Sequence, residues 1–284
     1  WSACRPRSRD CVLVAPPYTA PVSESSQLGR VFLVGAGPGD PELITLRAIR
    51  HIERADLVLY DALVHPELLQ HIPARAERVF VGKRGGRVSE RQTEINGRLV
   101  RAAQEGRTVV RLKGGDPYLF GRGSEEAEAL ANAGIPFEVV PGVPSPLAAT
   151  TYAGISLTHR DLASSVAFMT ATESPEKDTS SHDWAHLATA TQTLVIFMGR
   201  RRLASMMQAL MDHGRSPETP VAVVQWASLP RQRTVVGTVA NIHARVVEAG
   251  IGTPALTIVG EVVKLRETLR WFDIKPLFGR RVLV

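Results

Sequence analysis

A buried strand followed by a glycine-rich turn is the feature that most constrains this chain. The apolar run Val31–Val34 predicts a buried strand, and three alternating glycines follow within Gly35–Gly39. Asp40 and Pro41 then predict the start of a helix, because Asp can cap a helix and Pro suits its first turn. Since glycine lets a ligand approach the backbone closely, the strand, loop and helix start together predict a cofactor site.

The chemistry of this loop favours a cofactor without phosphate groups. A dinucleotide loop has the spacing Gly-x-Gly-x-x-Gly and places a pyrophosphate over the helix N-terminus. Asp40 occupies the position of the third glycine, where its carboxylate would repel a pyrophosphate. A phosphate-free or positively charged ligand therefore fits better. Asp61 follows the next apolar run, about where a dinucleotide fold places its ribose-binding acid, so this segment alone leaves a dinucleotide open.

Composition places the chain among globular proteins. Its 284 residues can bury two modest cores, and 44% of them are hydrophobic. No apolar run approaches the roughly 20 residues of a membrane span. The only two cysteines are Cys4 and Cys11, which excludes a Cys-based zinc site or a disulfide scaffold from the rest of the chain. A reducing, cytoplasmic location is therefore expected.

The net charge of +6 comes from a basic set that is mostly arginine, 29 of 34 residues. Arginine binds carboxylates bidentately, so this excess could serve a polyanionic substrate, although codon bias in a GC-rich genome is the favoured explanation for most of it. The arginines are scattered apart from Arg200–Arg202, which argues against a nucleic-acid surface. His182 and His186 have helical metal-ligand spacing, but no third ligand stands nearby. We therefore interpret residues 180–183 as a solvated helix start and predict no metal.

Apolar runs alternate with amphipathic stretches along most of the chain, which predicts α/β architecture with parallel or mixed sheets covered on both faces. Strands are expected at 31–34, 57–60, 79–81, 108–112, 137–140, 166–169, 193–197, 220–225, 234–236 and 255–259. Helices are expected at 42–54, 90–105, 124–133, 145–153, 202–213 and 239–249.

A break at Val140–Pro144 suggests a hinge between two domains. We expect a disordered leader over 1–29, an N-terminal α/β domain over 30–142, a C-terminal α/β domain over 143–272 and a linker over 273–284. Ligands of open α/β sheets bind beyond the carboxyl ends of the strands. The residues at or just after such ends are Gly35, Asp61, Lys113, Met198 and Gln225. They predict a site in a cleft between the two domains.

Four segments in order carry a family resemblance: Gly35–Pro41, Val81–Gly85, Val110–Glu126, and Pro136–Gly142 leading to Gly154–Asp161. Together they resemble the tetrapyrrole methylase family, from about Gly29 to Phe272. The resemblance implies a two-domain fold, usually a homodimer, with S-adenosylmethionine bound in the interdomain cleft and no metal. It is most similar to members that methylate uroporphyrinogen III at C2 and C7, giving precorrin-2 for sirohaem and corrinoid synthesis.

The resemblance also assigns residues. It implies that Asp61 is the general base and Lys83 the proton donor. The positions that it assigns to the methyl donor are Pro38, Gly114, Gly115, Asp116, Leu119, Pro144, Ser145, Met198 and Ala227. Uroporphyrinogen carries many carboxylates, so Arg122, Arg160 and Lys83 are expected to anchor it. Glu125 either contacts the substrate or caps the helix that follows Gly123.

Two positions depart from the family pattern. Members usually carry Ile-Thr-Ser/Ala-Ala after Pro-Gly, whereas this chain has Val143–Pro146, so Pro144 removes a hydroxyl and a backbone N–H. Ala227 stands where glycine is common. Both departures bear on donor affinity rather than on the fold.

Two alternatives remain open. One is another family member, such as a later precorrin methyltransferase or an RNA-modifying relative, which the segments Gly121–Glu126 and Thr158–Asp161 argue against. The other is a module that binds S-adenosylmethionine without turnover, which the presence of Asp61 and Lys83 argues against. At the far end, Val282–Val284 resembles the first strand of uroporphyrinogen III synthase, so a fused synthase is expected, the alternative being a tail that pairs with its own sheet.

Overall fold

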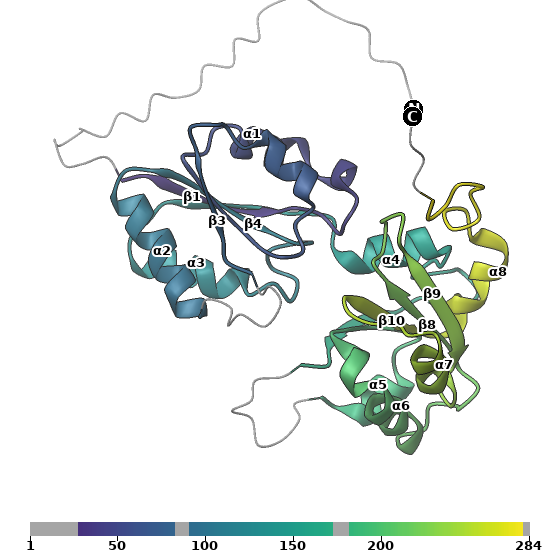
Figure 1. The fold of residues 1–284 in the computed structure, drawn as a ribbon. Helices are drawn as coiled ribbons and strands as arrows, with labels where there is room; N and C mark the ends of the chain where they lie inside the picture. Colours follow the sequence, from purple (N-terminus) through teal and green to yellow (C-terminus); the bar gives the residue numbers. More distant parts are fainter. Residues whose placement is uncertain (1–27, 83–90, 173–181, 281–284) are drawn as a thin grey trace, which may run out of the picture.

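The structure is a computed structural model that describes residues 28–82, 91–172 and 182–280. Almost all of the expected leader, the predicted proton donor Lys83 and the terminal run Val282–Val284 lie outside the described residues. The described parts form two α/β lobes, joined by the segment that runs from the first sheet into the second lobe (Figure 1). This is the predicted two-domain architecture.

The first lobe is built on a five-stranded parallel sheet with the order β3-β2-β4-β1-β5. Its strands are β1 (Arg30–Gly35), β2 (Leu57–Tyr60), β3 (Glu77–Phe80), β4 (Thr108–Lys113) and β5 (Phe137–Val140). Its helices are α1 (Leu46–Ile52), α2 (Gln92–Gln104) and α3 (Gly123–Asn132), with short 3-10 turns at η1 (Pro41–Leu43) and η2 (Pro66–His71). Helix α1 covers one face of the sheet, and α2 and α3 cover the other (Figure 1).

Successive side chains of each strand point to opposite faces of the sheet, so the core of this lobe has two parts, one on each face. Leu33 packs with Leu99 of α2 and Leu130 of α3, whereas Val34 packs with Ile52 of α1. All five side chains are fully buried. Both faces of the sheet are therefore apolar, which is why its strands appear in the sequence as continuous hydrophobic runs.

The second lobe contains a mixed five-stranded sheet with the order β6-β7-β10-β8-β9. Its strands are β6 (Val166–Thr170), β7 (Thr193–Phe197), β8 (Pro220–Gln225), β9 (Arg233–Thr238) and β10 (Ala255–Val259). Its helical segments are α4 (Ser145–Ala153), α5 (Trp184–Thr189), η3 (Gly199–Arg202), α6 (Leu203–Asp212), α7 (Ile242–Glu248), η4 (Glu261–Leu265) and α8 (Arg266–Leu269). Helices α5, α6 and α7 cover one face, and α4 with η4 covers the other (Figure 1).

The helix expected over 42–54 is wrong in its extent, because the segment divides in two. Asp40 does cap a helical turn, accepting a hydrogen bond from the Glu42 amide at 3.0 Å, but this turn is the short η1. The chain then becomes extended, and Thr45 caps α1 anew by accepting from the amide of Ala48 at 3.1 Å. A second cap residue thus restarts the helix a turn later.

The domain boundary expected after Gly142 remains a prediction. Helix α4 begins at Ser145, and its residues Ala149 and Ala153 pack in the core of the second lobe. Within the described ranges, no helix has the length and apolar character needed to cross a membrane.

Candidate functional site

Three loops of the first lobe meet at one edge of its sheet. Strands β1, β4 and β5 are parallel neighbours, so the loops after them start side by side. Gly37 and Gly115 bridge the first two loops, with N···O distances of 3.2 and 2.6 Å. The Asp116 carboxylate joins the second loop to the third by accepting from the Gly142 amide at 3.1 Å. The result is a cradle made of main chain, which we call the glycine cradle (residues 35–40, 114–119 and 142–145).

Two glycines of this cradle allow the backbones to approach. A Cβ atom on Gly35 would lie 2.5 Å from the Gly142 nitrogen, and one on Gly142 would lie 2.3 Å from the Gly115 oxygen. Both obstacles are backbone atoms, which cannot rotate away as a side chain can. These positions therefore need glycine for space.

The Asp116 side chain stabilises the conformation of the cradle. Besides Gly142, its carboxylate accepts from the amides of Tyr118 and Leu119 at 2.8 and 3.1 Å. The side chain that the sequence assigns to the methyl donor is therefore occupied by three backbone N–H groups. What Asp116 contributes to a ligand is the fixed conformation of its loop.

The second lobe closes over the first loop of the cradle at Asp40. The Asp40 amide donates to Ser228 Oγ at 2.9 Å, and its carboxylate accepts from Tyr152 Oη at 3.0 Å. Burial, together with the Asp40 carboxylate, raises the pKa of Tyr152 to about 12. A second contact joins the lobes, because the rings of Phe120 and Phe197 lie 4.7 Å apart between centroids. The cradle therefore lies where the lobes meet.

Backbone strain is concentrated around the same place. Among the described residues, five that are not glycine have a left-handed backbone: Phe120, Arg122, Met198, Trp226 and Ser228. All five lie in loops that follow β4, β7 or β8. A non-glycine residue in this conformation costs free energy and is held by its surroundings, and such residues cluster at functional sites.

Asp61 lies beside the cradle, at the first position after β2. Its amide donates to the Leu112 oxygen at 3.3 Å, and a Cβ on Gly114 would lie 2.8 Å from the Cβ of Leu63. The Asp61 side chain is 29% exposed, and its Oδ1 accepts from Arg111 Nη2 at 2.7 Å. A partly exposed carboxylate thus rests on a guanidinium that is only 3% exposed.

The guanidinium belongs to a buried ionic cluster beneath Asp61. Glu126 of α3 is fully buried, and its Oε1 accepts from Arg111 Nε and from Lys113 Nζ, each at 3.0 Å. Burial opposes the charge of Arg111, but Asp61 and Glu126 outweigh it and raise the pKa of Arg111. Burial and the neighbouring Arg111 lower the pKa of Lys113 despite the nearby Glu126.

The structure brings most of the predicted donor positions together. Gly115 adjoins the start of α4, since a Cβ on it would lie 3.8 Å from the Ser145 nitrogen and 3.9 Å from the Pro144 Cα. Gly39, next to Pro38, faces the second lobe, where its Cβ would lie 2.8 Å from the Ala227 oxygen. Pro38, Gly114, Gly115, Leu119, Pro144, Ser145 and Ala227 therefore surround one place.

Two other predicted residues, Met198 and Arg160, have different surroundings. Met198 follows β7 with its side chain 50% exposed, directly after the Phe197 that contacts Phe120. Arg160 lies on an exposed turn closed by the bridge between His159 and Ala163, and among the described residues it makes no hydrogen bond or ion pair with the cradle.

Glu125 does not cap α3. Its carboxylate makes a bidentate pair with Arg122, with Nε to Oε1 at 2.8 Å and Nη2 to Oε2 at 2.6 Å. The pair raises the pKa of Arg122 and lowers that of Glu125. Arg122 has a left-handed backbone at the helix start, which places its side chain beside Glu125. The capping interpretation is therefore wrong, and both groups are exposed.

Sequence reasoning missed four residues: Arg111, Glu126, Tyr152 and Ser228. A usable signal existed for Arg111, because a charged residue inside a buried strand needs a buried partner of opposite charge. Tyr152 and Ser228 gave no such signal, since they lie 112 and 188 residues from Asp40 in the sequence.

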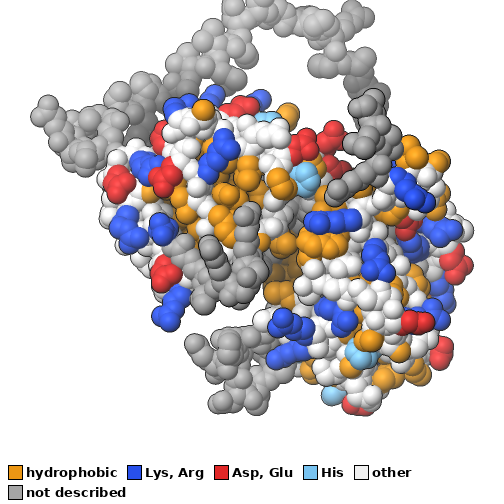
Figure 2. All heavy atoms as spheres, viewed as in Figure 1, with side chains coloured by type: hydrophobic (Ala, Val, Ile, Leu, Met, Phe, Trp, Pro, Cys, Tyr) orange, Lys and Arg blue, Asp and Glu red, His pale blue; other side chains and the backbone are white. Residues whose placement is uncertain are grey.

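The surface around the cradle is apolar as well as polar. Hydrophobic side chains gather on one face of the first lobe and along the boundary between the lobes (Figure 2). Large exposed hydrophobic residues of the site loops are Leu63, Tyr118, Phe120 and Met198. Apolar groups collected at a junction mark a binding surface.

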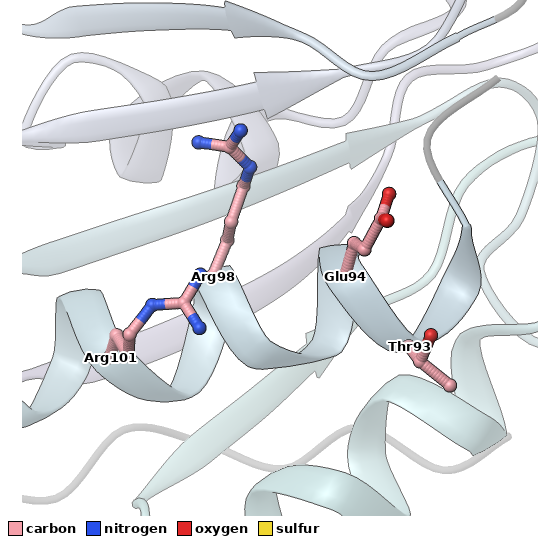
Figure 3. Close-up of a pocket in the computed structure, with 4 residues that line it drawn as sticks. All are labelled: Thr93, Glu94, Arg98 and Arg101. Atoms are coloured by element: carbon pink, nitrogen blue, oxygen red, sulfur yellow. The ribbon is translucent and has the colours of Figure 1, made fainter. Parts of the chain in front are cut away.

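Two pockets of the first lobe lie elsewhere. Thr93, Glu94, Arg98 and Arg101 surround a shallow pocket along α2 (Figure 3). A second hollow shares Arg98 and Arg101 and extends to Leu57 of β2 and Val79 of β3. Neither pocket is lined by a predicted site residue. We therefore place the candidate site at the glycine cradle.

Sequence and structural similarity relate the chain to known proteins. The family described as Tetrapyrrole (Corrin/Porphyrin) Methylases matches residues 30–243. A siroheme synthase from Azotobacter vinelandii is 51% identical over 247 residues, which cover 87% of this chain and 53% of that protein. An S-adenosyl-L-methionine-dependent uroporphyrinogen III methyltransferase from Methanosarcina barkeri is 49% identical, with coverage of 86% and 96%.

Among solved structures, the uroporphyrin-III C-methyltransferase of Thermus thermophilus, complexed with S-adenosylhomocysteine, has a TM-score of 0.71 and 42% identity. That likeness covers 84% of this chain and 100% of the other. The chain spans about half the length of the siroheme synthases that it matches.

Proposed function

Because this chain belongs to the tetrapyrrole methylase family, we propose that it transfers methyl groups from S-adenosylmethionine to C2 and C7 of uroporphyrinogen III, giving precorrin-2. The observation that carries the proposal is the glycine cradle with the Asp61 carboxylate beside it, between two lobes. Relatives that are named for this chemistry share about half of their aligned residues with the chain.

The cradle suits a donor that has no phosphate groups. The Asp40 carboxylate lies between the first loop and the second lobe, where it would repel a pyrophosphate but tolerates a sulfonium cation. The donor supplies an activated methyl group, so the protein's task is to orient it. The residues proposed to hold it are Pro38, Gly114, Gly115, Leu119, Pro144, Ser145, Met198 and Ala227, with Asp116 fixing the loop that contains three of them.

Asp61 is the proposed general base. Attack by a pyrrole carbon on the methyl group leaves a cationic ring, which becomes neutral only when a proton leaves or moves. The Asp61 carboxylate is partly exposed and lies beside Gly114, so it can accept that proton or stabilise the cation. Lys83, which lies outside the described residues, is proposed to donate a proton elsewhere on the macrocycle.

Arginine side chains are proposed to hold the substrate carboxylates. Arg122 lies just beyond the cradle, and its guanidinium already shows the bidentate geometry with Glu125 that a substrate carboxylate would use. Arg160 is a second proposed anchor from the second lobe. Glu125 would regulate access to Arg122 by competing with the substrate for it.

We further propose a homodimer in the cytoplasm, with a uroporphyrinogen III synthase domain fused behind the chain. The placement of both cysteines within the first eleven residues supports a reducing compartment. Measurement of the native subunit's mass tests the fusion, and light scattering tests the dimer.

The test of the activity is to incubate the protein with uroporphyrinogen III and isotopically labelled S-adenosylmethionine, and to count methyl groups by mass. Two labelled methyl groups on each macrocycle are expected. Methylation of a later precorrin in place of uroporphyrinogen III would instead indicate another activity of the family. Tight binding of S-adenosylhomocysteine with no transfer would indicate a module that only binds the donor.

A further inference from the structure

We propose that Arg111 and Glu126 are positioning residues, which fix the Asp61 carboxylate so that its second oxygen faces the site. The proposal rests on the function proposed above for Asp61.

Contacts on three sides fix the Arg111 guanidinium. Nη2 donates to Asp61 Oδ1 at 2.7 Å, Nε to Glu126 Oε1 at 3.0 Å, and Nη1 to the Leu112 oxygen at 3.2 Å. A planar guanidinium bound at both ends of its fork cannot rotate, so the position of Asp61 Oδ1 is set by β4 and α3. Asp61 Oδ2 makes no hydrogen bond to any other described residue, which leaves it available to a ligand.

The exposed fraction of the side chain increases from Glu126 through Arg111 to Asp61. Glu126 is fully buried, Arg111 is 3% exposed and Asp61 is 29% exposed. Glu126 Oε1 also accepts from Lys113 Nζ at 3.0 Å and from Gln92 Nε2 at 3.1 Å, so this one oxygen receives three donors. This is the arrangement that keeps a functional group within its productive geometry, because the supporting groups are locked by packing and hydrogen bonds.

Stability alone explains the cluster poorly. Burying ion pairs costs desolvation free energy, and well-packed apolar residues in their place are often equally stabilising. Here the charges occupy the α2 and α3 face of a strand whose Val109 packs in an apolar core. The cluster also ends at the carboxyl end of β4, one residue before the cradle begins at Gly114. A positioning role explains both why the buried cluster is charged and why it lies next to the glycine cradle.

The test uses Glu126→Gln, which keeps the shape of the side chain but removes its charge, and Arg111→Lys, which keeps the charge but loses the fork. We expect kcat to fall by about 10- to 100-fold, as for supporting residues elsewhere. The Kd for S-adenosylhomocysteine, measured by calorimetry, should change less than about two-fold, because the cradle does not use these groups.

Arg107→Lys is the matched control. Arg107 Nη2 pairs with Glu77 Oε2 at 2.8 Å just before β4, so the variant makes the same Arg-to-Lys change in a more exposed ion pair at the opposite end of the strand. Its kcat should equal that of the wild type. If Glu126→Gln and Arg111→Lys do not fold, Gln92→Leu serves instead, because it removes one bond to Glu126 without removing a charge. A smaller loss of kcat is then expected.

The deciding measurement repeats Glu126→Gln in an Asp61→Asn background. A residue that acts through Asp61 should cost less than about two-fold there, since residues that act as a unit are not additive. The same loss in both backgrounds would mean that Glu126 acts on the fold generally, and would overturn the proposal. Full activity of Asp61→Asn would also overturn it but leave the methyltransferase function standing. Failure of the wild type to transfer methyl groups would overturn both the proposed methyltransferase function and the positioning role.

Discussion

Asp61 combines partial exposure with a buried cationic partner, and this combination makes a direct test of its role possible. In Asp61→Asn the side chain keeps its shape but can no longer accept a proton. We expect kcat to fall by about 10²- to 10⁴-fold, the usual contribution of a general base. Donor affinity should stay near the wild-type value. Single-turnover methyl transfer and calorimetry measure the two quantities separately, and an unchanged single-turnover rate with weakened donor binding would contradict the assignment.

Pro144 is the residue at which the chain departs from its family inside the cradle. It is the N-cap of α4, makes no side-chain capping bond and lacks a backbone N–H. Pro144→Thr should restore both groups and tighten donor binding by on the order of 1 kcal/mol, the value of one hydrogen bond. Pro144→Val is the control, because it restores the N–H without the hydroxyl. Equal or weaker affinity in both variants would mean that the donor does not use this position.

At the scale of the elements, the loops of the cradle depend on the close approach of their backbones. Gly142→Ala would place a Cβ 2.3 Å from the Gly115 oxygen, so we expect a loss of about 1–3 kcal/mol in the free energy of unfolding, together with weaker donor binding. The matched variant is Gly97→Ala in α2, whose Cβ would meet only the flexible Arg101 side chain. That variant should stabilise the protein by about 0.5–1 kcal/mol. Chemical denaturation of both variants tests the contrast.

The strands were predictable because periodicity and burial agree in them. Strands β2, β5, β7, β8 and β10 begin and end at the predicted residues. Helix α4 also matches its predicted range, whereas the helix expected over 42–54 divides, because Thr45 caps a second start that the apolar pattern does not reveal. Strand β4 was predicted to end at residue 112 but includes Lys113, a buried cation whose partner on α3 lies 13 residues away. Local pattern predicts where an element lies and does not predict which long-range partner satisfies a charge within it.

At the scale of the whole molecule, the hydrogen bond from Tyr152 to Asp40 ties the two lobes together. The pKa of Tyr152 is raised from 10.0 to about 12, so the folded protein holds this proton more tightly than the unfolded chain. The resulting stability is complete below pH 10 and is lost as the pH rises through about 12. Tyr152→Phe should therefore lose less stability than the wild type over that interval.

Thermal unfolding at pH 9, 10 and 11 measures this difference. Tyr118→Phe is the control, because Tyr118 is exposed and its hydroxyl makes no hydrogen bond to another described residue. Parallel pH dependence of the wild type and Tyr152→Phe would show that the bond between the lobes does not control stability there.

The sequence predicted a candidate site at the strand ends but could not describe how the lobes meet. The strand-end rule identifies Gly35, Asp61 and Met198, since it depends only on the order of the elements. The contact of Asp40 with Ser228 joins residues that lie 188 positions apart, and nothing local to either residue indicates the other. Contacts between lobes depend on how both cores have packed, which a single-sequence pattern does not contain.

The main-chain construction of the cradle has a consequence for how this protein can vary. Amide and carbonyl groups do not change when a side chain is replaced, so exposed positions in these loops should accept many residues while the cradle keeps its form. Tolerance should end abruptly at Gly35 and Gly142, where any Cβ meets backbone. In a library that contains every single substitution, we therefore expect donor binding to persist across most variants at the exposed Tyr118 and at Val143, and to fail for nearly all variants at those two glycines.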